Sequence, residues 1–204
     1  MESYSAFQQR KKELCVNATL YAKNYYDPQL NLLWDRKYQV HQIRESTWIA
    51  QSYFQLGVEL DKANALVRRV IATQQYDGVR VGNFRWNYED NKVKDQNCAP
   101  FIVPSLAYIY RHHYHELKDD LKEQLKYALD LVYQEVLELE NHIPVWYGNV
   151  YLKLISCLVL LGDESTALQW TKKYDQFTRQ FGINEYAASN YAAVQLAGLQ
   201  NAYW

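Results

Sequence analysis

The chain has 204 residues, of which 49% are hydrophobic, 15% aromatic and 22% charged, and its formal net charge is −1. This composition supplies enough apolar surface for one domain with a hydrophobic core, which excludes a disordered chain. The near-neutral charge and the lack of a long basic run argue against nucleic acid as a partner. Only 7 Gly and 4 Pro are present, too few for the turns of an all-β sandwich or barrel.

Apolar residues recur at helical spacing along most of the chain, and strand signals are nearly absent. The pattern predicts an all-α fold of about eight helices in a single domain, residues 1–204. The aromatic-rich segment 25–41 is predicted to be a connector between the first two helices. In chain order, the expected helices span residues 5–24, 43–56, 61–74, 97–113, 117–139, 149–161, 164–181 and 189–204.

Short and long connections alternate between these helices. Short turns lie near Gly57, His115 and Gly162, at intervals of roughly 50 residues, as expected for stacked helical hairpins with long return connections. Tetratricopeptide and ankyrin arrays repeat at about 33 to 34 residues, so this period argues against them. HEAT-like solenoids, which repeat at about 40 to 47 residues, stay open.

Because consecutive hairpins run the same way, every helix that follows a long connector is predicted to begin at one shared end. Arg44, Asn97, Asn149 and Tyr191 lie at or near four such starts. Helix N-termini present unpaired amide donors and the positive end of a dipole. The sequence therefore predicts one rim suited to an anionic or hydroxyl-rich ligand.

Three segments along these connectors carry a family resemblance. They are GNFRW at Gly82–Trp86, DQN at Asp95–Asn97 and NEYAASNY at Asn184–Tyr191. They resemble segments of bacterial and fungal proteins of the (α/α) toroid, or six-hairpin glycosidase-like, superfamily. In that fold, inner and outer helices alternate and a pocket lies at one open end. The chain is short for a complete ring, so the resemblance implies a partial toroid, completed by a second copy or by a missing half.

The resemblance implies a carbohydrate-active enzyme, either a glycoside hydrolase or a polysaccharide lyase. Hydrolysis usually needs two carboxylates, for which Asp95 and Glu185 are predicted, and elimination needs a base such as Tyr147. Three further carboxylates are alternatives: Glu45, Glu89 and Asp90. The predicted substrate-binding residues are Arg44, Asn83, Arg85, Trp86, Asn97, Asn149, Tyr186 and Tyr191.

Each candidate also has a structural interpretation. Asp95 is a residue type that caps helices, and Trp86 can fasten its connector to the core. Arg44 can pair with a neighbouring carboxylate, while Tyr147 and Asn149 can form a turn and a cap. Only their recurrence on one rim favours the functional interpretation.

No metal or other cofactor is expected. His112 and His115 lie three residues apart, but no further ligand of matching spacing accompanies them. Cys15, Cys98 and Cys157 are an odd number without metal-type spacing, which is typical of reduced thiols in the cytosol.

A soluble, cytoplasmic protein without a membrane partner is predicted. Polar residues occupy the position where a secretory signal would have its apolar core. The most apolar run, LKLISCLVLLG, is interrupted by Lys153 and is shorter than the about 20 residues that span a bilayer.

The expected partner is a small-molecule or oligosaccharide ligand, and self-association is a further possibility. Two other functional classes stay open. A non-catalytic helical module would bind a glycan or a peptide at the same rim. A terpenoid-type cyclase would use the aromatic residues to stabilise a cation, although the aspartate-rich signatures of that class are missing.

Overall fold

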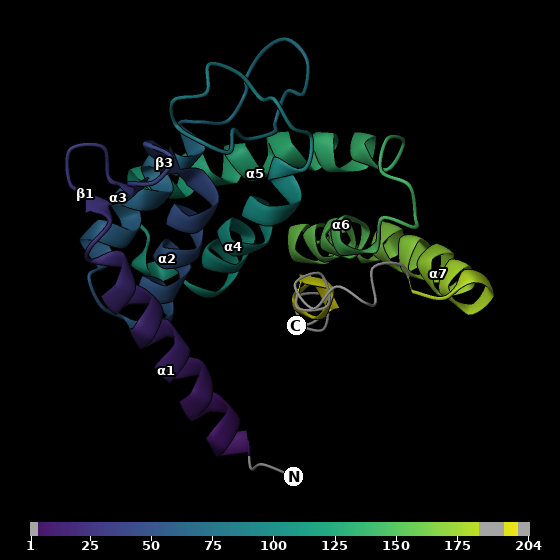
Figure 1. Cartoon of the computed structure of the whole chain (residues 1–204), viewed down its shortest axis with the longest axis horizontal. Coiled ribbons are helices and arrows are strands. Elements are labelled where there is room, and N and C mark those ends of the chain that lie inside the picture. Colours follow the sequence, from purple (N-terminus) through teal and green to yellow (C-terminus); the bar gives the residue numbers. More distant parts are fainter. Residues whose placement is uncertain (1–3, 184–193, 200–204) are drawn as a thin grey trace.

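The computed structural model describes residues 4–183 and 194–199, and it confirms the predicted helical fold (Figure 1). Residues 194–199 are also helical. The observed bounds of α2 and α7 coincide with the predicted ones. The elements are α1 (Tyr4–Ala22), β1 (Tyr26–Asp27), β2 (Leu32–Asp35), β3 (Val40–Gln42), α2 (Ile43–Leu56), α3 (Leu60–Ile71), α4 (Cys98–His112), the 3-10 helix η1 (Tyr114–Glu116), α5 (Asp119–Leu139), α6 (Gly148–Leu161) and α7 (Glu164–Phe181).

The prediction was wrong for the segment between α1 and α2, which folds into a small antiparallel sheet. Its strand order is β1-β2-β3, with Tyr26 opposite Leu33 and Leu33 opposite Gln42. Asn31 and Gln39, at φ 54° and 53°, turn the chain between the strands. These strands have only two to four residues, fewer than the usual five to six. They are therefore too short to show the alternating apolar and polar pattern by which a strand is predicted from sequence.

Left-handed glycines end the first helix of two hairpins. At the end of α2, Gly57 adopts φ 65°, and its N–H and that of Val58 donate to the carbonyls of Phe54 and Tyr53. Gly162, at φ 95°, ends α6 in the same way. Asp163 then begins α7, since its carboxylate accepts from the Thr166 N–H at 3.0 Å. Local signals therefore set these hairpin turns.

Helices α2 and α4 pack side by side and run in the same direction. Near their starts, the Trp48 indole N–H donates to the Phe101 carbonyl at 3.3 Å. Near their ends, the Phe54 and His113 rings lie 5.7 Å apart. Matching contacts at both ends require parallel helices.

Helix α6 continues this inner row. The Lys153 amine lies 5.9 Å from the centre of the Phe101 ring, near the starts of α6 and α4. The Arg111 guanidinium, near the end of α4, donates to the Val159 carbonyl, near the end of α6, at 3.0 Å. The three helices that follow long connectors thus begin on one shared face, which confirms that part of the prediction.

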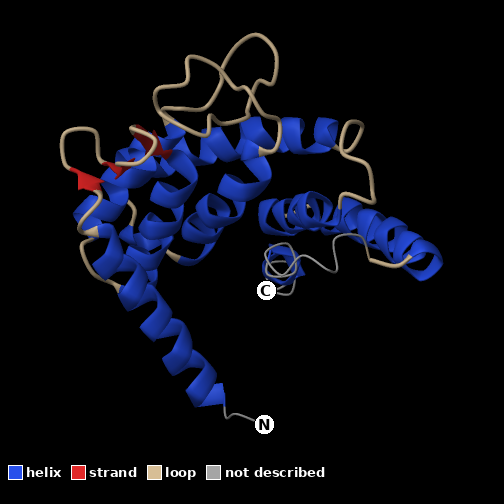
Figure 2. Cartoon of the chain, in the orientation of Figure 1, coloured by secondary structure: helices blue, strands red, loops and turns tan. Residues whose placement is uncertain are grey.

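The return helices form a second layer. Asn64, early in α3, donates to the Glu116 carbonyl at 3.0 Å and accepts from the Lys118 N–H at 2.9 Å, just before α5. Tyr133 of α5 donates to Asp163 at the start of α7 at 2.7 Å. The longest loop of the described chain, which joins α3 to α4, lies along the upper side of the view in Figure 2.

The core lies between the two layers. Its largest fully buried side chains include Tyr53, Phe54, Phe84 and Tyr151. Phe84 is notable because it comes from the long connector between α3 and α4, so part of that connector belongs to the core. Among the described residues, no helix combines the length and apolar character needed to cross a bilayer.

Candidate functional site

The shared face of the inner helices carries a cation enclosed by aromatic rings. The guanidinium carbon of Arg44, in the first turn of α2, lies 4.8 Å from the centre of the Trp48 ring and 5.3 Å from that of Trp86. The Phe101 ring is 6.0 Å away, and the guanidinium also pairs with the neighbouring Glu45. Cation–π contacts of this kind hold three segments together: the start of α2, the start of α4, and residues 81–97 of the loop between α3 and α4, which we call the 81–97 connector.

Trp86 and Asp95 are hydrogen-bonded to each other within that connector. The Trp86 indole N–H donates to Asp95 Oδ2 at 2.9 Å, and Asp95 Oδ1 accepts from the Asn97 N–H at 2.9 Å. Both carboxylate oxygens therefore have internal partners, which supports a structural role for Asp95. Asn97 is the N-cap residue of α4, and its buried Oδ1 has no hydrogen-bond partner among the described residues.

Asn83 lies inside the core, where its side chain makes four hydrogen bonds. Its Nδ2 donates to the Gln96 carbonyl and to Glu135 Oε1, both at 2.9 Å. Its Oδ1 accepts from the N–H groups of Phe84 at 2.8 Å and Ala99 at 2.9 Å. These bonds tie the connector to α4 and α5, so Asn83 acts as an internal anchor.

Two charged groups accompany this anchor. Burial raises the pKa of the Glu135 carboxyl, while the Asn83 hydrogen bond and the Arg80 charge act in the opposite direction. Arg85 donates to the carbonyls of Thr73, at 3.3 Å, and Asp90. Arg85 therefore supports connector backbone.

The remaining predicted residues lie at the start of α6 or outside the described part of the chain. Tyr147 packs against the core, and Asn149 is buried in the first turn of α6. One turn further on, Lys153 is buried, and that burial lowers the pKa of its amine. Glu185, Tyr186 and Tyr191 fall within residues 184–193, which the structure does not describe.

A cavity of about 450 Å³ opens between α1, the three-stranded sheet and α2. We call it the aromatic pocket. Its lining includes four aromatic and two carboxylate side chains: Tyr21, Tyr25, Trp34, Trp48, Asp35 and Glu45. Trp48 and Glu45 also contact Arg44, so the aromatic pocket adjoins the rim predicted from the sequence.

Polar side chains that line the aromatic pocket form hydrogen bonds within the protein. Asp35 Oδ1 accepts from the backbone N–H groups of Lys37 and Tyr38 at 2.9 and 3.1 Å. Asp35 Oδ2 accepts from the Gln42 amide at 2.7 Å. Arg36 donates to the carbonyl of Asn24 at 3.1 Å. Asp35, Arg36 and Gln42 are therefore held in place by the protein itself, which limits the ordering cost of binding for these side chains.

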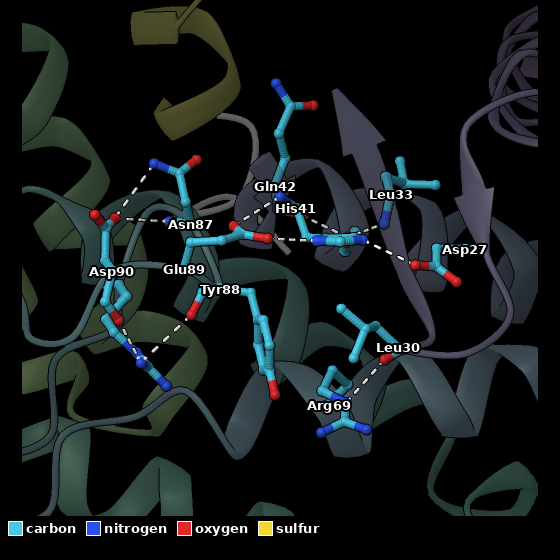
Figure 3. A network of polar contacts seen from close by, with 12 residues as sticks. Asp27, Leu30, Leu33, His41, Gln42, Arg69, Asn87, Tyr88, Glu89 and Asp90 are labelled. Atoms are coloured by element: carbon cyan, nitrogen blue, oxygen red, sulfur yellow. Dashed lines mark hydrogen bonds and ion pairs between the residues drawn. The ribbon is translucent and has the colours of Figure 1, made fainter. Parts of the chain in front are cut away.

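A buried histidine, His41, supports the sheet (Figure 3). The centre of the His41 ring lies 4.6 Å from that of the Trp34 ring. His41 Nδ1 is 2.5 Å from Glu89 Oε1, and Nε2 is 3.0 Å from Asp27 Oδ2. Since ionised carboxylates only accept, both hydrogen bonds form together when the ring carries two N–H groups. His41 thus joins β1, β3 and the 81–97 connector.

The carboxyl groups on either side of His41 are both more acidic than usual. The Gln29 backbone N–H and, after it, the His41 ring lower the pKa of Asp27. Burial acts to raise the pKa of Glu89, but hydrogen bonds from the His41 ring and backbone outweigh it and leave that pKa lowered. Both carboxyls therefore bind His41 most strongly when ionised.

Most residues of the aromatic pocket were not predicted from the sequence. Only Glu45 had been named, as an alternative carboxylate. Trp48 follows Glu45 by three residues in a predicted helix, so the pair shares a helical face. Trp34 and Asp35 lie in the segment taken for a simple connector. The combination of aromatic and charged residues in WDRK is the sequence signal that could have identified them.

Comparisons with protein-family models, curated proteins and solved structures find no match to this chain. The resemblance to the (α/α) toroid superfamily therefore stays a prediction.

Proposed function

We propose that this protein binds a saccharide in the aromatic pocket. The observation that carries the proposal is the mixed lining of one cavity, in which Tyr and Trp rings stand beside carboxylate and amide groups. The apolar faces of a sugar ring stack on aromatic side chains, while its hydroxyl groups pair with fixed donors and acceptors. A purely apolar substrate, as a cyclase would take, fits this lining less well.

The dimensions of the aromatic pocket support a small ligand. Its volume of about 450 Å³ falls in the lower part of the about 300 to 1,000 Å³ range of small-molecule sites. A mono- or disaccharide matches that volume. The side chain of Trp48 is 42% exposed, so one wall presents a ring to an incoming ligand.

Recognition is better supported than cleavage. Asp35 already accepts three hydrogen bonds, and Glu45 pairs with Arg44, so each carboxylate has internal partners. Asp95, the first catalytic candidate, also has both oxygens occupied. Glycoside hydrolysis is the second candidate function, because Asp35 and Glu45 line the same cavity and hydrolysis uses two carboxylates.

The binding proposal is tested by titrating a panel of neutral and acidic mono- and disaccharides into the protein, followed by calorimetry. Replacing Trp48 with Ala removes one stacking ring, and we expect affinity to fall about tenfold or more. Trp146→Ala is the matched control. Trp146 is 52% exposed and does not line the aromatic pocket, so affinity is expected to change by less than about twofold.

A second matched pair of variants tests whether the saccharide binds in the aromatic pocket or at exposed aromatic side chains in general. Tyr21 lines the aromatic pocket and is 64% exposed, whereas Tyr127 of α5 is 59% exposed and lies elsewhere. Tyr21→Ala is expected to weaken binding, and Tyr127→Ala to leave it unchanged. Equal losses in both variants, or no binding of any saccharide, would refute the proposal.

Cleavage is tested with aryl glycosides, whose hydrolysis releases a coloured phenol. Turnover that Glu45→Gln abolishes while saccharide binding persists would establish the hydrolase function. Binding without turnover in the unmodified protein would leave recognition as the function.

A further inference from the structure

A second cavity lies at the opposite end of α2 and α4 from their shared starts. Its volume is about 450 Å³, and its walls come from α1 and from the C-terminal ends of α2 and α4. The lining includes Lys11 and Lys12 of α1, Gln55 of α2, and Tyr108 and His113. This cavity, which we call the basic pocket, shares no lining residue with the aromatic pocket.

The two lysines of the basic pocket have no carboxylate partner in the described part of the chain. No carboxylate is among its lining residues, and neither Lys11 nor Lys12 forms an ion pair within residues 4–183 and 194–199. Neighbouring Arg10, in contrast, pairs with Glu13 at 3.7 Å. Instead of a carboxylate, the Lys11 amine faces the Tyr108 ring, 5.6 Å from its centre.

A histidine in the lining adds an unsatisfied polar atom. His113 Nδ1 is buried and has no hydrogen-bond partner among the described residues. The Glu116 Oε1 atom lies 3.6 Å from it, and the His113 side chain is 14% exposed. A buried ring nitrogen without a hydrogen-bond partner is costly.

The positive potential extends beyond the lining. Burial lowers the pKa of the adjacent His112, and the charges of Arg111, His113 and Lys11 lower it further. The C-terminal ends of α2 and α4 oppose this potential with about half an elementary charge each. At α2, that charge is reduced because Gly57 and Val58 N–H groups already cap the last carbonyls. The two ammonium charges of Lys11 and Lys12 therefore exceed the partial negative charge of the two helix ends.

We propose that the basic pocket binds a phosphate monoester. A phosphate monoester carries about −1.5 to −2 charges at pH 7, which matches the two lysine ammonium groups. Its oxygens accept hydrogen bonds from Lys11, Lys12 and the Gln55 amide. The organic group on the ester packs against the Tyr108 ring. The site is independent of saccharide binding in the aromatic pocket.

The test uses phenyl phosphate as the probe, titrated by calorimetry at constant ionic strength. Inorganic phosphate and benzoate form two comparison arms. We expect phenyl phosphate to bind most tightly, because only phenyl phosphate offers both the dianion and the ring. Replacing both lysines, Lys11→Gln with Lys12→Gln, is expected to weaken its binding about tenfold or more.

Two further variants give the proposal its controls. The pair Lys172→Gln with Lys173→Gln removes adjacent lysines from α7 and changes the net charge equally, and it is expected to change affinity by less than about twofold. Tyr108→Ala is expected to weaken phenyl phosphate but not inorganic phosphate. Circular dichroism checks that each variant is folded.

Three outcomes would overturn the proposal. Absence of phenyl phosphate binding in the unmodified protein would show that the basic pocket is not a phosphate monoester site. An equal loss in the α7 lysine pair would assign the effect to net charge alone. Benzoate binding as tightly as phenyl phosphate would show that the basic pocket does not select a phosphate group. None of these outcomes bears on saccharide affinity, so failure here and failure of the proposed function are distinguishable.

Discussion

The two long connectors of this protein carry similar residues but use them in opposite ways. The segment between α1 and α2 folds into a sheet whose Trp34 and Asp35 line the aromatic pocket. The segment between α3 and α4 directs Asn83 and Phe84 into the core, where both are fully buried. Aromatic and polar residues in a connector thus indicate that the connector is constrained, but not whether a ligand or the core constrains it.

The contrast follows from what surrounds each segment. The 81–97 connector lies over α5, and its polar groups meet buried partners such as Glu135. The sheet lies beside α1, which leaves a cavity between them. The two connectors meet where β3 runs beside residues 86–89, through His41 with Tyr88 and Glu89 and through Gln42 with Asn87.

The largest expected effect concerns Gly82, at φ 91°. A Cβ atom there would lie 2.5 Å from the Leu131 carbonyl oxygen of α5. We expect Gly82→Ala to lower the free energy of unfolding by about 3 to 5 kcal/mol. Gly78→Ala is the control, because Gly78 has a similar φ of 73° but its nearest atom would be 3.7 Å away, and about 1 kcal/mol is expected. Urea denaturation measures both, and equal losses would contradict close packing of this connector.

Removing the internal anchor is expected to have the next largest effect. Asn83→Ala leaves several buried groups without partners and should lower the free energy of unfolding by about 2 to 4 kcal/mol. Saccharide affinity should not change. Asn91→Ala, at an exposed position of the same connector, is expected to stay within about 0.5 kcal/mol. A loss of saccharide affinity in folded Asn83→Ala would show that this connector binds the ligand after all.

A pair of tryptophan variants compares the connectors directly. Trp34→Ala is expected to weaken saccharide binding about tenfold and to cost about 1 to 2 kcal/mol of stability, because the ring is partly buried against His41. Trp86→Ala is expected to cost similar stability while saccharide affinity is retained. Calorimetry and urea denaturation give the two readouts. If Trp86→Ala weakened saccharide binding and Trp34→Ala did not, the saccharide would bind at the 81–97 connector instead.

The smallest effect is expected at the contact between the two connectors. At pH 7, Glu89→Gln should lower the free energy of unfolding by about 1 kcal/mol, a modest amount because the side chain is 40% exposed and solvent screens its charge. Glu123→Gln, at an exposed position of α5, is the control and should change little.

The lowered pKa of Glu89 also predicts that its contribution to the free energy of unfolding depends on pH. The pKa of Glu89 is lowered from its ordinary value of 4.5 in the folded protein. Its stabilising contribution is therefore present above pH 4.5 and is lost as the pH falls through the folded value. The difference between the unmodified protein and Glu89→Gln should shrink toward zero in acid. A difference that is constant across this pH range would mean that ionised Glu89 does not stabilise the fold.

Much of the helical framework was predictable because its signals are local. Helical periodicity and the turns near Gly57 and Gly162 together predicted the bounds of α2 and α7. The shared starts of α2, α4 and α6 followed from the alternation of short and long connections. The sheet was missed because its strands have only two to four residues, too few for a periodic pattern.

The direction in which connector side chains face was decided only by the tertiary structure. Asn83 bonds to Glu135, 52 positions away, and His41 bonds to Glu89, 48 positions away. Such pairs form because packed helices bring distant segments together, and no local pattern records which polar groups will meet. The sequence by itself determined that the chain is helical and where α2 and α7 begin and end, whereas burial of one connector and the opening of a cavity beside the other depended on long-range packing.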